Sequence, residues 1–319
     1  MTKCLSSLSL AGALLGLTLV SAPAQATATR VWVSGKGSDT NPCTLALPCR
    51  TFAYALTQTS PGGEIDVLDP AGYGAVTITQ AVSIINDGVG EVGLQAAAGG
   101  AAITINAGPN DVIHLRGLTL EGGGTALNGI VFNAGGILEV LNSTVRHFTN
   151  NGFNITPGNS SGFLISNTFV SANGNFGIRI APSGAAVVNG VIHKVTASDN
   201  YNDGIRINGA SSTGRASVTI VDSVISKNGG NGIYAGSSSS GAAPSVTLRN
   251  SVVSYNAYGV YASNYSTFRI AHSGITDNTN YGAYIIAGGN SFINSYSDNN
   301  IDGNGTGDVY GTLSSLSPH

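Results

Sequence analysis

From residue 129 onwards, hydrophobic and polar residues follow one short phrase that recurs along the chain. It consists of a glycine, an apolar residue, a variable residue and a second apolar residue, as in Gly177-Ile178-Arg179-Ile180. The copies begin at Gly129, Gly152, Gly177, Gly204, Gly232, Gly259 and Gly282, at intervals of 23 to 28 residues. Apolar residues that alternate with a period of two predict short β-strands with both apolar side chains inside. Repeats of this length predict a stacked solenoid.

Two columns of polar residues divide each repeat into strands and bends. The first column comprises Asn142, Asn167, Asp222, Asn250 and His272, and the second comprises Asn173, Asn200, Asn228, Asn256 and Asn278. We expect the first column to satisfy the backbone of the turns and to bond from coil to coil, which is a structural role. We expect the second column to occupy corners, because asparagine tolerates the left-handed backbone that corners require. Shorter alternating segments between residues 64 and 120 continue the pattern towards the N-terminus. The chain is therefore predicted to be an all-β, right-handed parallel β-helix of roughly eight to ten coils.

The residues ahead of the first coil predict a cap. Residues 51–59 carry apolar side chains at helical spacing, and a short helix there would cover the open end of the solenoid. Cys43 and Cys49 each follow a proline, and we expect a disulfide between them. A metal site is the alternative, but two thiolates without a nearby histidine leave the coordination incomplete.

The first residues have the pattern of a signal peptide for export. Lys3 precedes an apolar run over residues 8–20, and Ala24-Gln25-Ala26 has the form of a cleavage site. We expect residues 1–26 to be a signal peptide, 27–63 the cap and 64–319 the β-helix. A retained interfacial anchor is the alternative, since the run is too short for an ordinary membrane span. The protein is accordingly expected to be secreted or periplasmic, with no membrane span after signal removal.

Composition mainly argues against nucleic acid as a partner and against a bound metal. Charged residues make up 9% of the chain and the formal net charge is −3, so no basic surface for nucleic acid is expected. The histidines lack the spacing of metal ligands, and we expect neither a metal nor another cofactor.

Several phrases resemble a known group. The Gly-Ile-x-Ile and Asn-Ser-x-Val phrases resemble those of secreted bacterial right-handed parallel β-helix repeat proteins of the pectin-lyase-like superfamily. The stretch from Val33-Ser34-Gly35 through Pro48-Cys49-Arg50-Thr51-Phe52, with Gly72-Tyr73-Gly74, resembles the cap of members without an assigned activity. The resemblance covers nearly the whole mature chain and implies the fold. It does not imply one activity, because the superfamily includes polysaccharide lyases, glycoside hydrolases, epimerases, phage tailspikes and adhesins.

The variable position of the phrase is the first candidate for function, because alternation turns it towards solvent. The candidate binding residues there are Asn154, Arg179, Arg206, Tyr234, Tyr261 and Tyr284. Arginine forks suit carboxylates and flat aromatic faces suit sugar rings, so our leading hypothesis is a strip that binds polysaccharide. The alternative is that paired tyrosines only stabilise the sheet, as in a structural or adhesive solenoid.

A second candidate is the densest group of titratable residues. Asp199, Asp203 and Arg206 lie close together in sequence, and they would be the catalytic residues of a lyase or glycoside hydrolase acting on an acidic glycan. However, neither the Asp-Asp and Gly-His-Gly motifs of polygalacturonases nor the Arg-x-Pro-x-x-Arg motif of pectate lyases is present. Carboxylates at turns commonly serve as turn formers. The sequence leaves open whether the protein is an enzyme, which glycan it would take and its oligomeric state.

Overall fold

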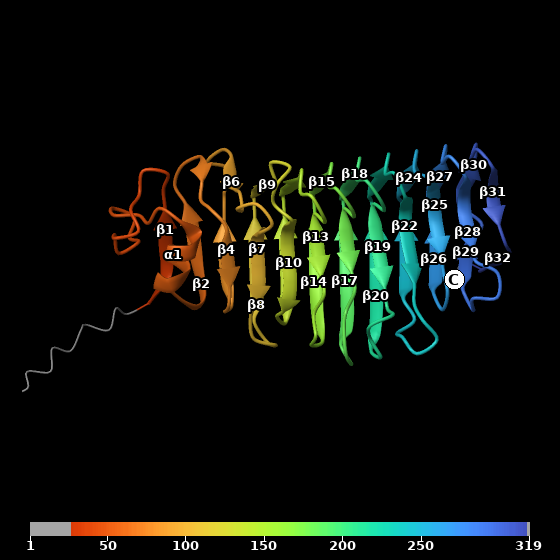
Figure 1. Ribbon diagram of the computed structural model, residues 1–319, viewed down its shortest axis with the longest axis horizontal. Coiled ribbons are helices and arrows are strands. Elements are labelled where there is room, and N and C mark those ends of the chain that lie inside the picture. The colour runs from red at the N-terminus through yellow and green to blue at the C-terminus, as the bar shows by residue number, and fades with distance from the viewer. Residues whose placement is uncertain (1–26, 318–319) are drawn as a thin grey trace, which may run out of the picture.

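The computed structural model describes residues 27–317, and the predicted signal peptide lies outside the described residues. The chain winds into a parallel β-helix of about ten turns, and Figure 1 shows its strands stacked along one long axis. The predicted fold class is confirmed. Within residues 27–317, no helix has the length and apolar character needed to cross a membrane.

Three parallel sheets form the sides of the solenoid. Sheet A contains, in order, β1 (Ala28–Val33), β2 (Thr59–Val67), β5 (Val82–Ile85), β8 (Val112–Arg116), β11 (Ile137–Leu141), β14 (Ser161–Ser166), β17 (Val187–His193), β20 (Arg215–Val221), β23 (Ser245–Arg249), β26 (Thr267–Ala271), β29 (Phe292–Ser295) and β32 (Leu313–Ser315). Sheet B contains β3 (Ala71–Gly72), β6 (Val92–Leu94), β9 (Thr119–Glu121), β12 (Thr144–Arg146), β15 (Phe169–Ser171), β18 (Thr196–Ser198), β21 (Val224–Ser226), β24 (Val252–Ser254), β27 (Gly274–Thr276) and β30 (Asn300–Asp302). Sheet C contains β4 (Val76–Ile78), β7 (Ala101–Asn106), β10 (Asn128–Ala134), β13 (Phe153–Ile155), β16 (Ile178–Ile180), β19 (Ile205–Asn208), β22 (Asn231–Gly236), β25 (Tyr258–Ala262), β28 (Tyr281–Ile285) and β31 (Gly307–Tyr310).

The core is a stack of aliphatic side chains from the recurring phrase. Ile178 of β16 pairs with Ile205 of β19, which in turn pairs with Ile233 of β22, and all three are fully buried. Each coil thus places its apolar residues directly above those of the coil before it. Because the register keeps inner and outer positions distinct, the variable position of the phrase is held on the outer face.

The corners differ in part from the prediction. The first polar column adopts left-handed backbone, with φ between 47° and 52°. In the second column the left-handed residue is instead the one before each asparagine, such as Asp199 (φ 56°) before Asn200 and Lys227 (φ 57°) before Asn228. The expectation that these asparagines themselves take left-handed backbone is wrong, because their side chains turn into the interior, where Asn200 is 1% exposed.

These buried side chains form a continuous asparagine ladder. The ladder comprises Asn173, Asn200, Asn228, Asn256, Asn278 and Asn304. Each side-chain amide donates to the oxygen of the next rung at 2.9 to 3.1 Å. The ladder also explains the glycine of the phrase, since a Cβ on Gly204 would lie 2.7 Å from Asn228 Nδ2 and 2.9 Å from the Gly232 carbonyl oxygen. Close packing against the ladder, rather than left-handed backbone, requires glycine there.

The N-terminal cap has the predicted helix. This helix, α1 (Phe52–Gln58), begins where the Thr51 hydroxyl accepts a hydrogen bond from the Tyr54 N–H. Its buried face packs against the first coil, and the Phe52 ring lies 5.0 Å from the Tyr73 ring. The helix therefore covers core that would otherwise be exposed at this end.

The cap also contains the predicted disulfide, between Cys43 and Cys49. It closes the loop between β1 and α1. β1 pairs in parallel with β2, so sheet A already begins within residues 27–63.

Candidate functional site

The variable positions form one column on the outer face of sheet C. We define the sheet C strip as Asn154, Arg179, Arg206, Tyr234, Tyr261, Tyr284 and Tyr310, which pair in register on the consecutive strands from β13 to β31. Six of these residues are partly exposed, and Tyr310 is 42% exposed at the last strand. The predicted column exists, and it is one residue longer than expected.

The tyrosines of the strip stack on one another. Ring centroids are 5.7 Å apart between Tyr234 and Tyr261, 4.7 Å between Tyr261 and Tyr284, and 4.6 Å between Tyr284 and Tyr310. The interplanar angles of 8° to 24° make these rings nearly parallel. Each ring covers the face of its neighbour, so the strip offers ring edges and hydroxyls rather than the free aromatic faces that we expected.

A second column of tyrosines supports the stack from one side. Tyr258 lies edge-on to Tyr261, at 5.4 Å and 86°, and Tyr281 lies 5.4 Å from Tyr310 at 61°. Sequence reasoning missed Tyr258 and Tyr281, although both stand directly before a glycine of the phrase. Reading that position along the repeat would have revealed them.

Tyr310 was not predicted as part of the column for a different reason. In the last coil, Gly307 pairs with Tyr281 and Tyr310 pairs with Tyr284, so Asp308 occupies the position of the phrase glycine. A search anchored on glycine therefore fails at this coil.

Arg206 is held rigidly at the start of the tyrosine stack. Its guanidinium lies 3.9 Å from the centre of the Tyr234 ring and 5.0 Å from that of Phe176. Its Nη1 donates to Asp203 Oδ2 at 2.7 Å. The Asp203 side chain is 4% exposed, and its Oδ1 accepts from both the backbone and side-chain nitrogens of Asn231 at 2.8 Å. Every oxygen of this carboxylate is thus engaged in positioning its neighbours.

Within residues 27–317, Arg179 has no carboxylate partner like the one that Asp203 provides for Arg206. Its Nη1 donates to Asn154 Oδ1 at 2.8 Å, but no carboxylate among the described residues lies within 4.0 Å of its guanidinium. Burial, followed by the positive charge of Arg206, lowers the pKa of Arg179 below its usual value. The guanidinium is therefore a half-buried cation without a counter-charge, and a bound anion would relieve the unfavourable environment.

The proposed catalytic residues are only partly brought together. Asp203 and Arg206 are in contact, whereas Asp199 is exposed at the corner after β18. Asp199 lines a concavity of about 460 Å³ with His147 and Tyr201, and neither Asp203 nor Arg206 lines it. The hypothesis of glycan cleavage by these three residues stays a prediction.

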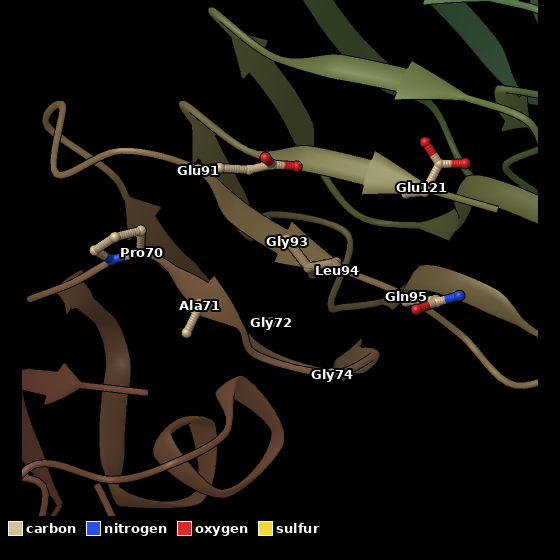
Figure 2. A pocket seen from close by; sticks show the side chains of 9 residues that line it. All are labelled: Pro70, Ala71, Gly72, Gly74, Glu91, Gly93, Leu94, Gln95 and Glu121. Atoms are coloured by element: carbon tan, nitrogen blue, oxygen red, sulfur yellow. The ribbon is translucent and has the colours of Figure 1, made fainter. Parts of the chain in front are cut away.

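A separate hollow of about 630 Å³ lies on sheet B. Figure 2 shows residues that line it, among them Glu91 immediately before β6 and Glu121 at the end of β9. Burial alone would raise the pKa of Glu121, but hydrogen bonds from the Gly123 N–H, Arg146 and His147 lower it below its usual value. No candidate site residue lines this hollow, and the sequence pattern did not indicate it.

Histidines are paired with acids rather than gathered into a metal site. The four histidines between residues 27 and 317 each have a ring nitrogen within 3.4 Å of a carboxylate from the adjacent coil. In the same part of the chain, no group of three or more histidine, cysteine, aspartate or glutamate side chains is placed to hold a metal ion.

Comparisons with known proteins agree on the fold. The family described as "Right handed beta helix region" matches residues 203–316. The pectate lyase Pel9A is similar in structure, with a TM-score of 0.64 and 15% identity over 91% of this chain and 80% of that one. ORF18 of Geobacillus virus E2 has a TM-score of 0.57 and 11% identity over 88% of this chain and 59% of that one. No curated protein sequence matches significantly. The chain therefore has the right-handed parallel β-helix fold.

Proposed function

We propose that the protein binds an acidic polysaccharide along the sheet C strip. The observation that carries this proposal is Arg179, a half-buried guanidinium that contacts an amide oxygen and no carboxylate. A uronate carboxylate would supply the missing counter-charge through charge-assisted hydrogen bonds. Arg206 would contribute less, because Asp203 already neutralises it.

The rest of the strip suits an extended polymer. Seven residues on consecutive strands, at about 4.8 Å per step, span roughly 30 Å on one face. The tyrosine edges present a row of hydroxyls, which can both donate to and accept from sugar hydroxyls. The charge of Arg179 would select an acidic sugar unit, and the tyrosines would hold the polysaccharide along its length.

Two further facts support this choice of ligand and compartment. The structurally similar pectate lyase is named for an acidic polysaccharide, so pectate is a reasonable first probe. The disulfide between Cys43 and Cys49 and the signal-like residues 1–26 support an extracellular or periplasmic location, where disulfides persist.

The test compares polygalacturonate with its methyl-esterified form, which keeps the backbone and loses the charge. We expect the protein to bind the acidic polymer more tightly, with an affinity that falls as salt rises. Arg179→Gln should weaken this binding about ten- to hundredfold, the value of one charge-assisted hydrogen-bonding group. Affinity would be measured by isothermal titration calorimetry with defined oligomers.

Arg215→Gln is the matched control, because Arg215 is an exposed arginine on β20 of sheet A. Its binding should equal that of the unaltered protein. Equal affinity for the charged and esterified polymers, or unchanged affinity in Arg179→Gln, would rule out the proposal.

A further inference from the structure

A hollow rich in hydrogen-bond donors lies on sheet A, away from the sheet C strip. Its volume is about 480 Å³, which falls in the range of small-molecule sites. The lining residues are Thr247, Arg249, Arg269, Ala271, His272, Tyr296 and Asp298. They come from β23, from β26 and the corner after it, and from the segment after β29.

Strand register brings the two arginines together. Thr247 of β23 pairs with Arg269 of β26, and Arg249 pairs with Ala271. Arg249 and Arg269 are therefore diagonal neighbours on the outer face, at a spacing that long side chains easily bridge. The residue beside Arg249 on β26 is a small alanine, and both arginines line the hollow.

Neither arginine is neutralised by a neighbour. Arg269 Nη1 donates to Ser245 Oγ at 3.0 Å, and within residues 27–317 no carboxylate lies within 4.0 Å of either guanidinium. Like charges at this spacing repel each other unless an anion lies between them.

The acid that lines the hollow, Asp298, and the nearby Asp222 both already interact with other side chains. Asp298 Oδ1 accepts from the His272 N–H at 3.0 Å, and its Oδ2 lies 3.1 Å from His272 Nδ1. On the far side of Arg249, the Asp222 carboxylate accepts a hydrogen bond from Asn250 and lies 3.4 Å from His193 Nε2. Both carboxylates are therefore directed to other partners.

We propose that this hollow binds the oxyanion group of a small ligand, either a free ion or the acidic group of a sugar. Arg249 and Arg269 grip the oxyanion, because guanidinium groups match carboxylate, sulfate and phosphate oxygens. The hydroxyls of Thr247 and Tyr296 line the same hollow and bond to hydroxyl groups of the ligand. The site is independent of the proposed polysaccharide strip, since it lies on another sheet and uses other arginines.

The test uses the full chain carrying Arg179→Gln, so that the strip cannot contribute. Titration calorimetry with inorganic phosphate, inorganic sulfate, galacturonate and galactose separates a free ion from a sugar acid as the source of the oxyanion. At least one anion should bind at one site per chain, and galactose should not bind. Arg249→Gln and Arg269→Gln should each weaken that binding about tenfold or more, and Arg249→Lys should weaken it less because charge is retained.

Arg215→Gln again serves as the control, and thermal unfolding checks that each variant is folded. Failure of all three anions to bind saturably would overturn the proposal. So would binding that survives the double variant Arg249→Gln/Arg269→Gln. Because the strip is disabled throughout, these outcomes are distinct from failure of the polysaccharide proposal.

Discussion

Two ladders run along the same coils, the asparagine ladder inside and the sheet C strip outside. Inside, the same residue recurs because each side-chain oxygen accepts both a backbone N–H and the amide of the rung before it, as Asn228 does for Asn200 at 3.1 and 2.9 Å. Outside, the residue changes from asparagine to arginine to tyrosine while the backbone repeats unchanged. The coil therefore dictates the inner ladder and leaves the outer one free.

The sheet C strip itself has two parts. The tyrosines can be explained by their own stacking, which stabilises neighbouring strands whether or not a ligand exists. Arg179 cannot be explained in this way, because it gains no counter-charge from the fold. Within the strip, the tyrosines thus serve the coil, whereas the environment of Arg179 favours a bound anion.

The largest loss of stability is expected from a change in the asparagine ladder. Asn228→Ala would leave the Asn200 N–H and side-chain amide without their acceptor in a site that is 1% exposed. We expect the free energy of unfolding to fall by about 3 kcal/mol, because buried donors lose their partners. Urea unfolding followed by circular dichroism would measure this loss.

Asn202→Ala is the matched control for that change. Asn202 is exposed and donates to Asn175 Oδ1 at 2.7 Å, so it makes a similar bond between coils at the surface. Its loss should cost less than about 0.5 kcal/mol. Equal losses for the two variants would contradict the distinction between a required inner ladder and a replaceable surface.

The next effect tests the contact between Asp203 and Arg206. Arg206→Gln should lower the free energy of unfolding by about 2 kcal/mol, less than for a fully buried pair because Arg206 is 27% exposed and Asp203 keeps its bonds from Asn231. A double-mutant cycle with Asp203→Asn should show a coupling of about 1 kcal/mol or more. Additive losses would mean that the pair is not the reason for the position of Arg206.

Sequence reasoning predicted the repeated coil well, because the alternation in Gly-Ile-x-Ile is a local property that specifies strand and face together. It also placed the disulfide and the helix after Thr51 correctly. It did not distinguish Arg179 from Arg206, although the residue three positions earlier is Phe176 in one coil and Asp203 in the other. The reason is that it assigned the local contact between Asp203 and Arg206 to a catalytic cluster and not to an ion pair. The arrangement of Arg249 and Arg269 was hidden, because coils of unequal length set their register.

A smaller effect is expected from the tyrosine stack. Tyr284→Leu keeps an apolar side chain but removes a ring that lies 4.7 Å from Tyr261 and 4.6 Å from Tyr310. We expect the free energy of unfolding to fall by about 1 kcal/mol, the usual value of aromatic pairing beyond burial. Tyr201→Leu, at a tyrosine that is 75% exposed, is the control. A variant as stable as the original would show that the stack does not serve the coil, and would shift its explanation towards ligand binding.

The smallest effect concerns alkaline pH. Burial, then the neighbouring tyrosines, raise the pKa of Tyr261 and Tyr284 above the ordinary value of about 10. Because the folded protein favours the neutral phenols, their contribution to stability is fully present below the unfolded pKa and is lost as pH rises through the folded pKa. In the double variant Tyr261→Phe/Tyr284→Phe, stability measured by urea unfolding should therefore fall less steeply above pH ~10 than in the unaltered protein. Identical alkaline profiles would show that the stack tolerates charge, and hence that its rings are more open to solvent than their mutual stacking implies.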